Sequence, residues 1–130
     1  MKKGLAVIII AAIMLTACIL EIIYVHNTFT KMDVMVESLL VEIDKDEENV
    51  KRAQTLDKAN EIKNYWDKRK RLTEIMLNHI LLIEYDARIT RVKSNIETNE
   101  RELSVIDGDQ LQKMTKQLKE LHTPHFHNIL

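Results

Sequence analysis

The sequence has 130 residues, with 19 Lys and Arg, 20 Asp and Glu and a formal net charge of −1. Because charges of both signs alternate along the chain, the composition excludes a basic surface for nucleic acid and predicts none for an anionic membrane. The length allows one small domain beside any anchor, and the single cysteine, Cys18, leaves no thiol pair for a disulfide.

An apolar stretch covers residues 4–25 and contains a single charged residue, Glu21. As an α-helix this stretch would be about 33 Å long, close to the thickness of the hydrocarbon core of a bilayer. Lys2 and Lys3 precede it, so the positive-inside rule predicts that residues 1–3 are cytoplasmic and that residues 26–130 lie outside the membrane. The sequence therefore predicts a single-pass protein of the cell membrane.

The same stretch allows a second interpretation. Leu15-Thr16-Ala17-Cys18 is similar to a bacterial lipobox and follows a charged start and an apolar segment. On this interpretation the signal is cleaved and Cys18 becomes a lipidated first residue. The apolar run continues past Cys18 to Val25, however, whereas lipoproteins usually continue into a polar tether. We favour the uncleaved transmembrane helix, and the lipoprotein is the alternative.

The remainder of the chain favours helices throughout. Neither glycine nor proline occurs between Gly4 and Gly108, and Pro124 is the only proline, so strands and tight turns have little support. Apolar residues at positions 25, 29, 32, 36, 39 and 43 alternate spacings of four and three, which predicts that the anchor continues unbroken into a helix with a packed seam. We expect an all-α fold in which one transmembrane helix continues into an antiparallel bundle of three to four helices.

Three further segments follow the first helix. The acidic cluster at residues 44–48 predicts a turn, and a second helix is expected from Glu47 to about Asn78. A third helix is expected over residues 82–106, in which the polar Asn99 occupies one seam position and sets the register. Gly108 predicts a left-handed cap that ends this helix, and a short last helix would then run to Thr123.

The histidines are the strongest candidates for chemistry. His122, His125 and His127 are close enough in sequence to suggest a metal site, but no carboxylate in the tail completes a ligand set. We therefore predict no metal and no cofactor. His79 is expected on the apolar face of its helix as a hydrogen-bonded core residue.

A basic run at residues 68–71 is the remaining candidate. Four consecutive helical residues spread around most of the axis, so we expect a solvated face with one arginine stem packed inward. No nucleophile has a recognisable base motif beside it, and the sequence predicts that the protein is not an enzyme.

The chain resembles a known family in several sparse features. These are a Met-Lys-Lys start, a membrane segment that runs into a helix, and the residues Trp66, Lys68, Leu72, Asn78, His79 and the ending Asn128-Ile129-Leu130. They are similar to those of short membrane-anchored helical proteins from spore-forming Firmicutes such as Clostridia, a family catalogued as a domain of unknown function. The resemblance implies Trp66, His79 and Asn128 as a possible family motif and implies no activity.

Two classes of function stay open at this point. The first is a membrane-anchored interaction or structural module, which presents a helical bundle to a protein partner outside the membrane and which could form a homo-oligomer. The second is a ligand-sensing or metal-handling ectodomain that uses the histidines. We favour the first, because the regular features of the sequence are packing seams and none requires a small molecule.

Overall fold

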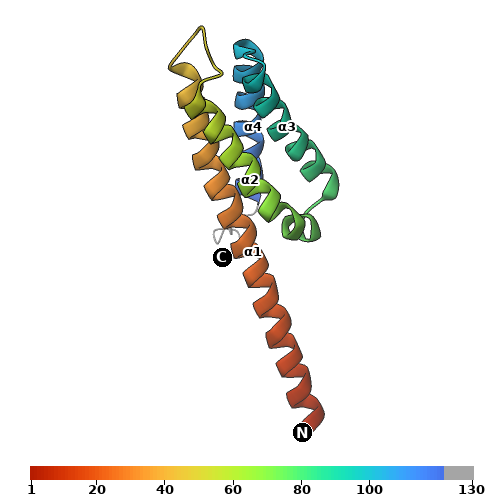
Figure 1. The fold of residues 1–130 in the computed structure, drawn as a ribbon. Helices are drawn as coiled ribbons and strands as arrows, with labels where there is room; N and C mark the ends of the chain where they lie inside the picture. The colour runs from red at the N-terminus through yellow and green to blue at the C-terminus, as the bar shows by residue number, and fades with distance from the viewer. Residues whose placement is uncertain (122–130) are drawn as a thin grey trace.

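The computed structural model describes residues 1–121, which form four α-helices and contain no strand. The helices are α1 (Lys2–Asp44), α2 (Ala53–Met76), α3 (His79–Glu97) and α4 (Arg101–Leu121). They run up and down in turn, and each packs against two others, with α1 beside both α2 and α4 and α3 beside the same two helices (Figure 1). The all-α class and the four-helix architecture predicted from the sequence are confirmed.

Helix α1 has two halves with different surroundings. Residues 1–23 are all exposed, and this part of the helix extends beyond the bundle, as Figure 1 shows. Burial begins at Val25, and the predicted seam of alternating spacings is buried throughout (Val25, Phe29, Met32, Val36, Leu39 and Ile43). Within residues 1–121, α1 alone is long and apolar enough to cross a membrane. The predicted unbroken passage from the apolar stretch into the packed helix is confirmed.

The connection between α1 and α2 is longer than the sequence predicted. The carboxylate of Asp46 accepts hydrogen bonds from the backbone N–H groups of Glu48 and Asn49, both at 3.0 Å, and so closes a local turn. Val50, which follows, is fully buried outside any helix. The expected start of the second helix at Glu47 is therefore wrong, because the side chain of Asp46 holds these N–H groups in a non-helical arrangement.

The turn between α3 and α4 also differs from the prediction. Asn99 has a φ of 59° and lies in a turn, where its side chain accepts a hydrogen bond from the backbone N–H of Lys51 at 3.1 Å. Asparagine tolerates this left-handed conformation better than most residues. The predicted role of Asn99 as a buried seam residue is wrong, and so is the single helix that was expected over residues 82–106.

Gly108 lies inside α4 and not at a helix end. A Cβ atom at this position would be 2.6 Å from Cδ2 of Leu40, so the absence of a side chain lets α4 approach α1 closely. The buried face of α4 is rich in small and polar residues (Ser104, Gly108, Leu111, Thr115 and Leu118). Leu103 and Ile106, which the sequence placed in the seam, are 48% and 46% exposed.

Candidate functional site

The centre of the bundle is a cluster of three aromatic side chains from three helices. Trp66 of α2 lies against Tyr85 of α3 with 4.9 Å between the ring centroids and an interplanar angle of 80°. Phe29 of α1 contacts both rings, at 6.2 Å from Trp66 and 5.7 Å from Tyr85. All three side chains are fully buried. Edge-to-face pairs of this kind add to the free energy of burial, so the cluster joins α1, α2 and α3.

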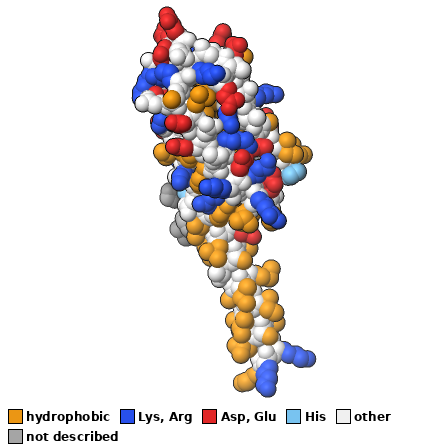
Figure 2. Space-filling model, viewed as in Figure 1, with side chains coloured by type: hydrophobic (Ala, Val, Ile, Leu, Met, Phe, Trp, Pro, Cys, Tyr) orange, Lys and Arg blue, Asp and Glu red, His pale blue; other side chains and the backbone are white. Residues whose placement is uncertain are grey.

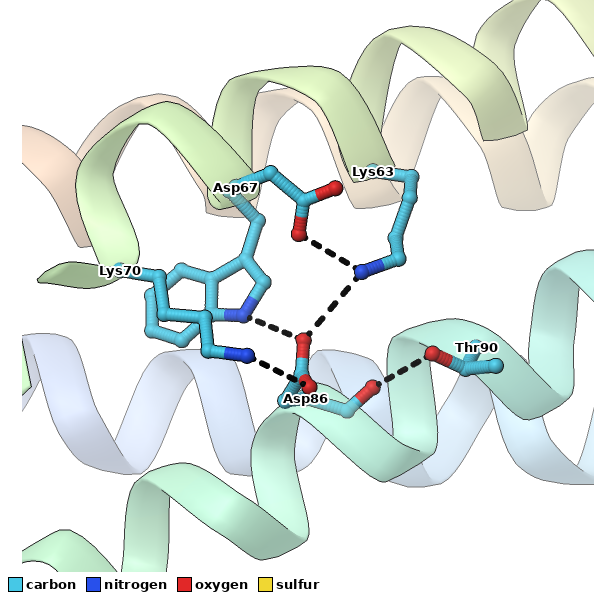
Figure 3. A network of polar contacts seen from close by, with 6 residues as sticks. Lys63, Asp67, Lys70, Asp86 and Thr90 are labelled. Atoms are coloured by element: carbon cyan, nitrogen blue, oxygen red, sulfur yellow. Dashed lines mark hydrogen bonds and ion pairs between the residues drawn. The ribbon is translucent and has the colours of Figure 1, made fainter.

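A polar network borders this cluster between α2 and α3 (Figure 3). The indole N–H of Trp66 donates to Oδ1 of Asp86 at 3.0 Å, and Nζ of Lys70 donates to Oδ2 of the same carboxylate at 3.0 Å. Nζ of Lys63 lies 2.6 Å from Asp67 and 3.4 Å from Asp86. Two ammonium groups thus face two carboxylates. The network balances its own charge and ties α2 to α3, and it does not need an ionic ligand to be satisfied.

The hydroxyl of Tyr85 is hydrogen bonded inside the bundle. It lies 2.8 Å from Oγ1 of Thr115, and Thr115 donates its own proton to the carbonyl of Leu111 at 2.7 Å. The phenol of Tyr85 is therefore the donor to Thr115. Burial raises the pKa of Tyr85 well above its ordinary value, which keeps the phenol neutral. Tyr85 is held as a structural group and is not placed to exchange protons with solvent.

We expect Asp86→Asn to reduce stability at neutral pH and to leave it almost unchanged in acid. Burial opposes the ionisation of Asp86, but the hydrogen bond from Lys70 and the charges of Lys63 and Lys70 outweigh it, so the pKa of the carboxyl lies below its ordinary value. Since an unfolded aspartate titrates near pH 3.9, the contribution of Asp86 is fully present above about pH 5 and is lost as the pH falls through the lowered pKa.

Urea unfolding of the parent and of Asp86→Asn across this pH range measures the effect. The difference in the free energy of unfolding should shrink as the pH falls, because protonated aspartic acid resembles asparagine. Asp57→Asn, at an exposed position of α2, is the control and should show no such trend. A difference that is independent of pH would contradict the role of the Asp86 charge.

The structure does not bring the sequence-predicted site residues together. His122, His125, His127 and Asn128 lie outside the described residues. His79 is the first residue of α3 and is exposed, so the prediction of a core histidine is wrong. The apolar positions beside it belong to a helix start that follows the capping side chain of Asn78, and the buried face of α3 begins at Leu82. Cys18 is exposed on the free half of α1.

The basic run of α2 divides as its helical spacing predicted. The guanidinium of Arg69 packs over the rings of Tyr24 and Tyr65, at 4.8 Å and 5.3 Å from their centroids, and Lys70 pairs with Asp86. Lys68 and Arg71 point to solvent. One arginine stem is therefore packed inward, as expected, and the four residues do not form a single patch.

Sequence reasoning missed the network around Asp86. Its lysine partners lie 16 and 23 residues away in the chain, on another helix, so no local spacing marks Asp86 as different from other exposed-looking acids. The only sequence feature that could have indicated the network is the position of Asp86 directly after the seam residue Tyr85. Such a residue lies at the border of a helix interface, where a carboxylate can reach a neighbouring helix.

Comparison with known proteins gives one match. No curated protein and no solved structure is significantly similar to this chain. A family model described as "Domain of unknown function (DUF4363)" matches residues 19–129, which include the second half of the long helix and all of the bundle. The chain belongs to this family of domains of unknown function, DUF4363.

Proposed function

We propose that the protein is a membrane-anchored module of the bacterial cell envelope, in which residues 26–130 lie outside the cytoplasmic membrane and bind or support another protein. The observation that carries the proposal is the continuity of α1 (Figure 1). Its first half is apolar and, among residues 1–121, is exposed along residues 1–23, and its second half packs against α2 and α4 as one side of the bundle. A rigid helix of this kind holds a domain at a fixed distance from a bilayer.

The interior of the bundle supports an interaction role and not a catalytic one. The void at its centre, lined by Leu39, Ile62, Ile89 and Leu111 among others, is too narrow to admit water. Buried side chains of the aromatic cluster fill the space where α1, α2 and α3 meet. A protein of this type offers its outer surface to partners, and we infer that it has no enzymatic activity of its own.

The bacterial setting rests on the resemblance of the start, the Trp66 helix and the ending to proteins of Firmicutes such as Clostridia. The positive-inside rule supports the orientation, because Lys2 and Lys3 directly precede the apolar half of α1. The orientation is open to a direct topology experiment.

Labelling with a membrane-impermeant maleimide tests the orientation. In a Cys18→Ser background, cysteine introduced at the exposed position Glu61 should react on intact cells, whereas cysteine introduced at Lys3 should react only after the membrane is opened. The opposite pattern would show that the bundle is cytoplasmic and would reject the envelope role.

Photo-crosslinking in cells tests the interaction role. A benzophenone amino acid placed at Glu61, Arg91 or Lys113, which are exposed on three different helices, should give an adduct of reproducible mass from at least one position. The same amino acid at buried Ile89 is the matched control and should give none. If every exposed position fails to form an adduct with another protein, the interaction role is wrong.

We expect Cys18→Ser to leave membrane attachment intact. An uncleaved transmembrane helix does not need a lipid for anchoring, and serine changes the apolar half of α1 by one small polar group. Fractionation of the variant and the mass of the mature parent protein measure this. A mature chain that begins at Cys18 and carries acyl chains would instead establish the lipoprotein interpretation.

A further inference from the structure

The end of the bundle where α2 turns into α3 carries an exposed apolar surface. Ile75 is 75% exposed and Ile80 is 74% exposed, more than almost any other large hydrophobic residue of the bundle. Leu81 lines a groove that it shares with Leu121 of α4. We call this surface the apolar tip, and it consists of Leu72, Ile75, Ile80, Leu81, Ile83 and Leu121. Six exposed aliphatic side chains at one end of a small domain indicate a surface that is covered in use.

The position of the apolar tip indicates what covers it. Arg69 packs over the ring of Tyr24, so this part of α2 lies beside the point where α1 leaves the bundle. From Arg69, α2 continues toward the free half of α1, and Ile75 is about 9 Å further along the helix. Figure 1 shows the turn between α2 and α3 at the end of the bundle from which the free half of α1 emerges. The apolar tip therefore lies near the level of Ile19 and Ile23, at the outer end of the membrane segment.

The charges along the bundle match this position. Between positions 68 and 83 the chain has four cationic residues and one acid, Glu74, with Asp67 and Glu84 directly outside this range. Lys70 pairs with Asp86 and Arg69 packs on two tyrosines, so Lys68 and Arg71 are the exposed cations of the run. The acidic residues of the connection between α1 and α2, by contrast, lie at the far end of the bundle, where Figure 2 shows red side chains. Lys68 and Arg71 are exposed and have long apolar stems, so they can lie along a bilayer surface with their charges at anionic headgroups.

We propose that the apolar tip is a second membrane contact, which inserts into the headgroup region of the bilayer that α1 spans while Lys68 and Arg71 bind anionic lipid. The inference rests on the proposed membrane anchorage of α1. It adds that the bundle does not stand free above the bilayer but rests on it. The long axis of the domain is then held by two contacts, and the surface near the far acidic end is left for protein partners.

Lipid quenching of a fluorophore tests the proposal in the full chain. A Cys18→Ser protein with one nitrobenzoxadiazole-labelled cysteine is reconstituted into vesicles of zwitterionic and anionic phospholipid that contain spin-labelled lipid. Ile80→Cys reports on the apolar tip, and Ile83→Cys gives a second position. Val34→Cys is the matched control, because Val34 is 64% exposed on α1 but lies about 14 Å above Val25. Ile13→Cys reports on the membrane segment itself.

We expect quenching at residues 80 and 83 to be several-fold stronger than at residue 34, with residue 13 quenched most by deep spin labels. Quenching at residue 13 without quenching at residues 80 and 83 would overturn the second contact and leave the anchor in place. No quenching at residue 13 would reject the anchor itself. A blue-shifted label at residue 80 without lipid quenching would show that a second copy of the chain covers the tip, which also overturns the proposal.

A separate experiment tests whether Lys68 and Arg71 bind anionic lipid. Lys68→Gln combined with Arg71→Gln should reduce quenching at residue 80 in vesicles with anionic lipid and should have no effect in vesicles of zwitterionic lipid alone. Equal quenching of the two proteins in both kinds of vesicle would show that these cations do not bind headgroups.

Discussion

Replacement of Trp66 by alanine is expected to destabilise the bundle by about 3–5 kcal/mol. The indole is fully buried between the rings of Phe29 and Tyr85, which come from two other helices. Its removal leaves a large cavity at the point where three helices meet. It also removes the N–H donor of Asp86, so the half-buried carboxylate loses one of its hydrogen bonds.

Chemical unfolding of the full chain in mild detergent, followed by circular dichroism, measures this effect. Leu72→Ala on the same helix is the matched control, because Leu72 is 48% exposed and its truncation should cost less than about 1 kcal/mol. A loss of similar size for both variants would mean that Trp66 is not part of a close-packed core.

Gly108→Phe is expected to have the second large effect, a destabilisation of roughly 1–3 kcal/mol or more. Even the Cβ atom of a new side chain would lie 2.6 Å from Cδ2 of Leu40, and a phenyl ring has no space between α4 and α1. The helices must separate or repack to accept it. Asp109→Phe, one residue further along the same helix at an exposed position, is the control and should be tolerated.

Two smaller substitutions at the same site test the helical conformation of Gly108 itself. Gly108→Ala improves helix propensity, and the end of the Leu40 side chain can rotate away from one methyl group. In a helix, Gly108→Asn should therefore be less stable than Gly108→Ala. The reverse order, measured in the same unfolding experiment, would indicate the left-handed cap that the sequence pattern favours.

The long first helix was predictable because two strong local signals overlap. The apolar stretch needs no partner to be recognised, and the alternating spacing from Val25 to Ile43 continues it without a helix-breaking residue. Trp66 could be placed in a helix for the same reason, by the apolar positions around it. The helical class follows from the scarcity of glycine and proline, which acts on every segment at once.

The position of the turn between α3 and α4 was not predictable, because the local preferences of Asn99 and Gly108 favoured a later helix end. A glycine such as Gly108 often marks a helix end, yet here it lies inside α4, where a Cβ atom would be 2.6 Å from the end of the Leu40 side chain. Asn99 matched a seam position, yet it takes the left-handed conformation and binds Lys51 in another connection. Both conformations depend on contacts between distant parts of the chain. The buried face of α4 was also not recognised from apolar spacing, because it includes Ser104 and Thr115.

By itself, the sequence determined that this chain is helical, that one end is an apolar segment long enough for a membrane, and that the segment continues into a packing seam. These properties depend on periodicity and local composition. The tertiary structure decided which acids meet which lysines around Trp66. It also placed the basic run of α2 near the free half of α1 and the acidic residues 44–48 at the opposite end of the bundle. Where these charged residues lie depends on the antiparallel order of the four helices. Because the chain reverses direction between α1 and α2, residues 68–83 lie beside the end of the anchor and residues 44–48 lie at the opposite end of the bundle.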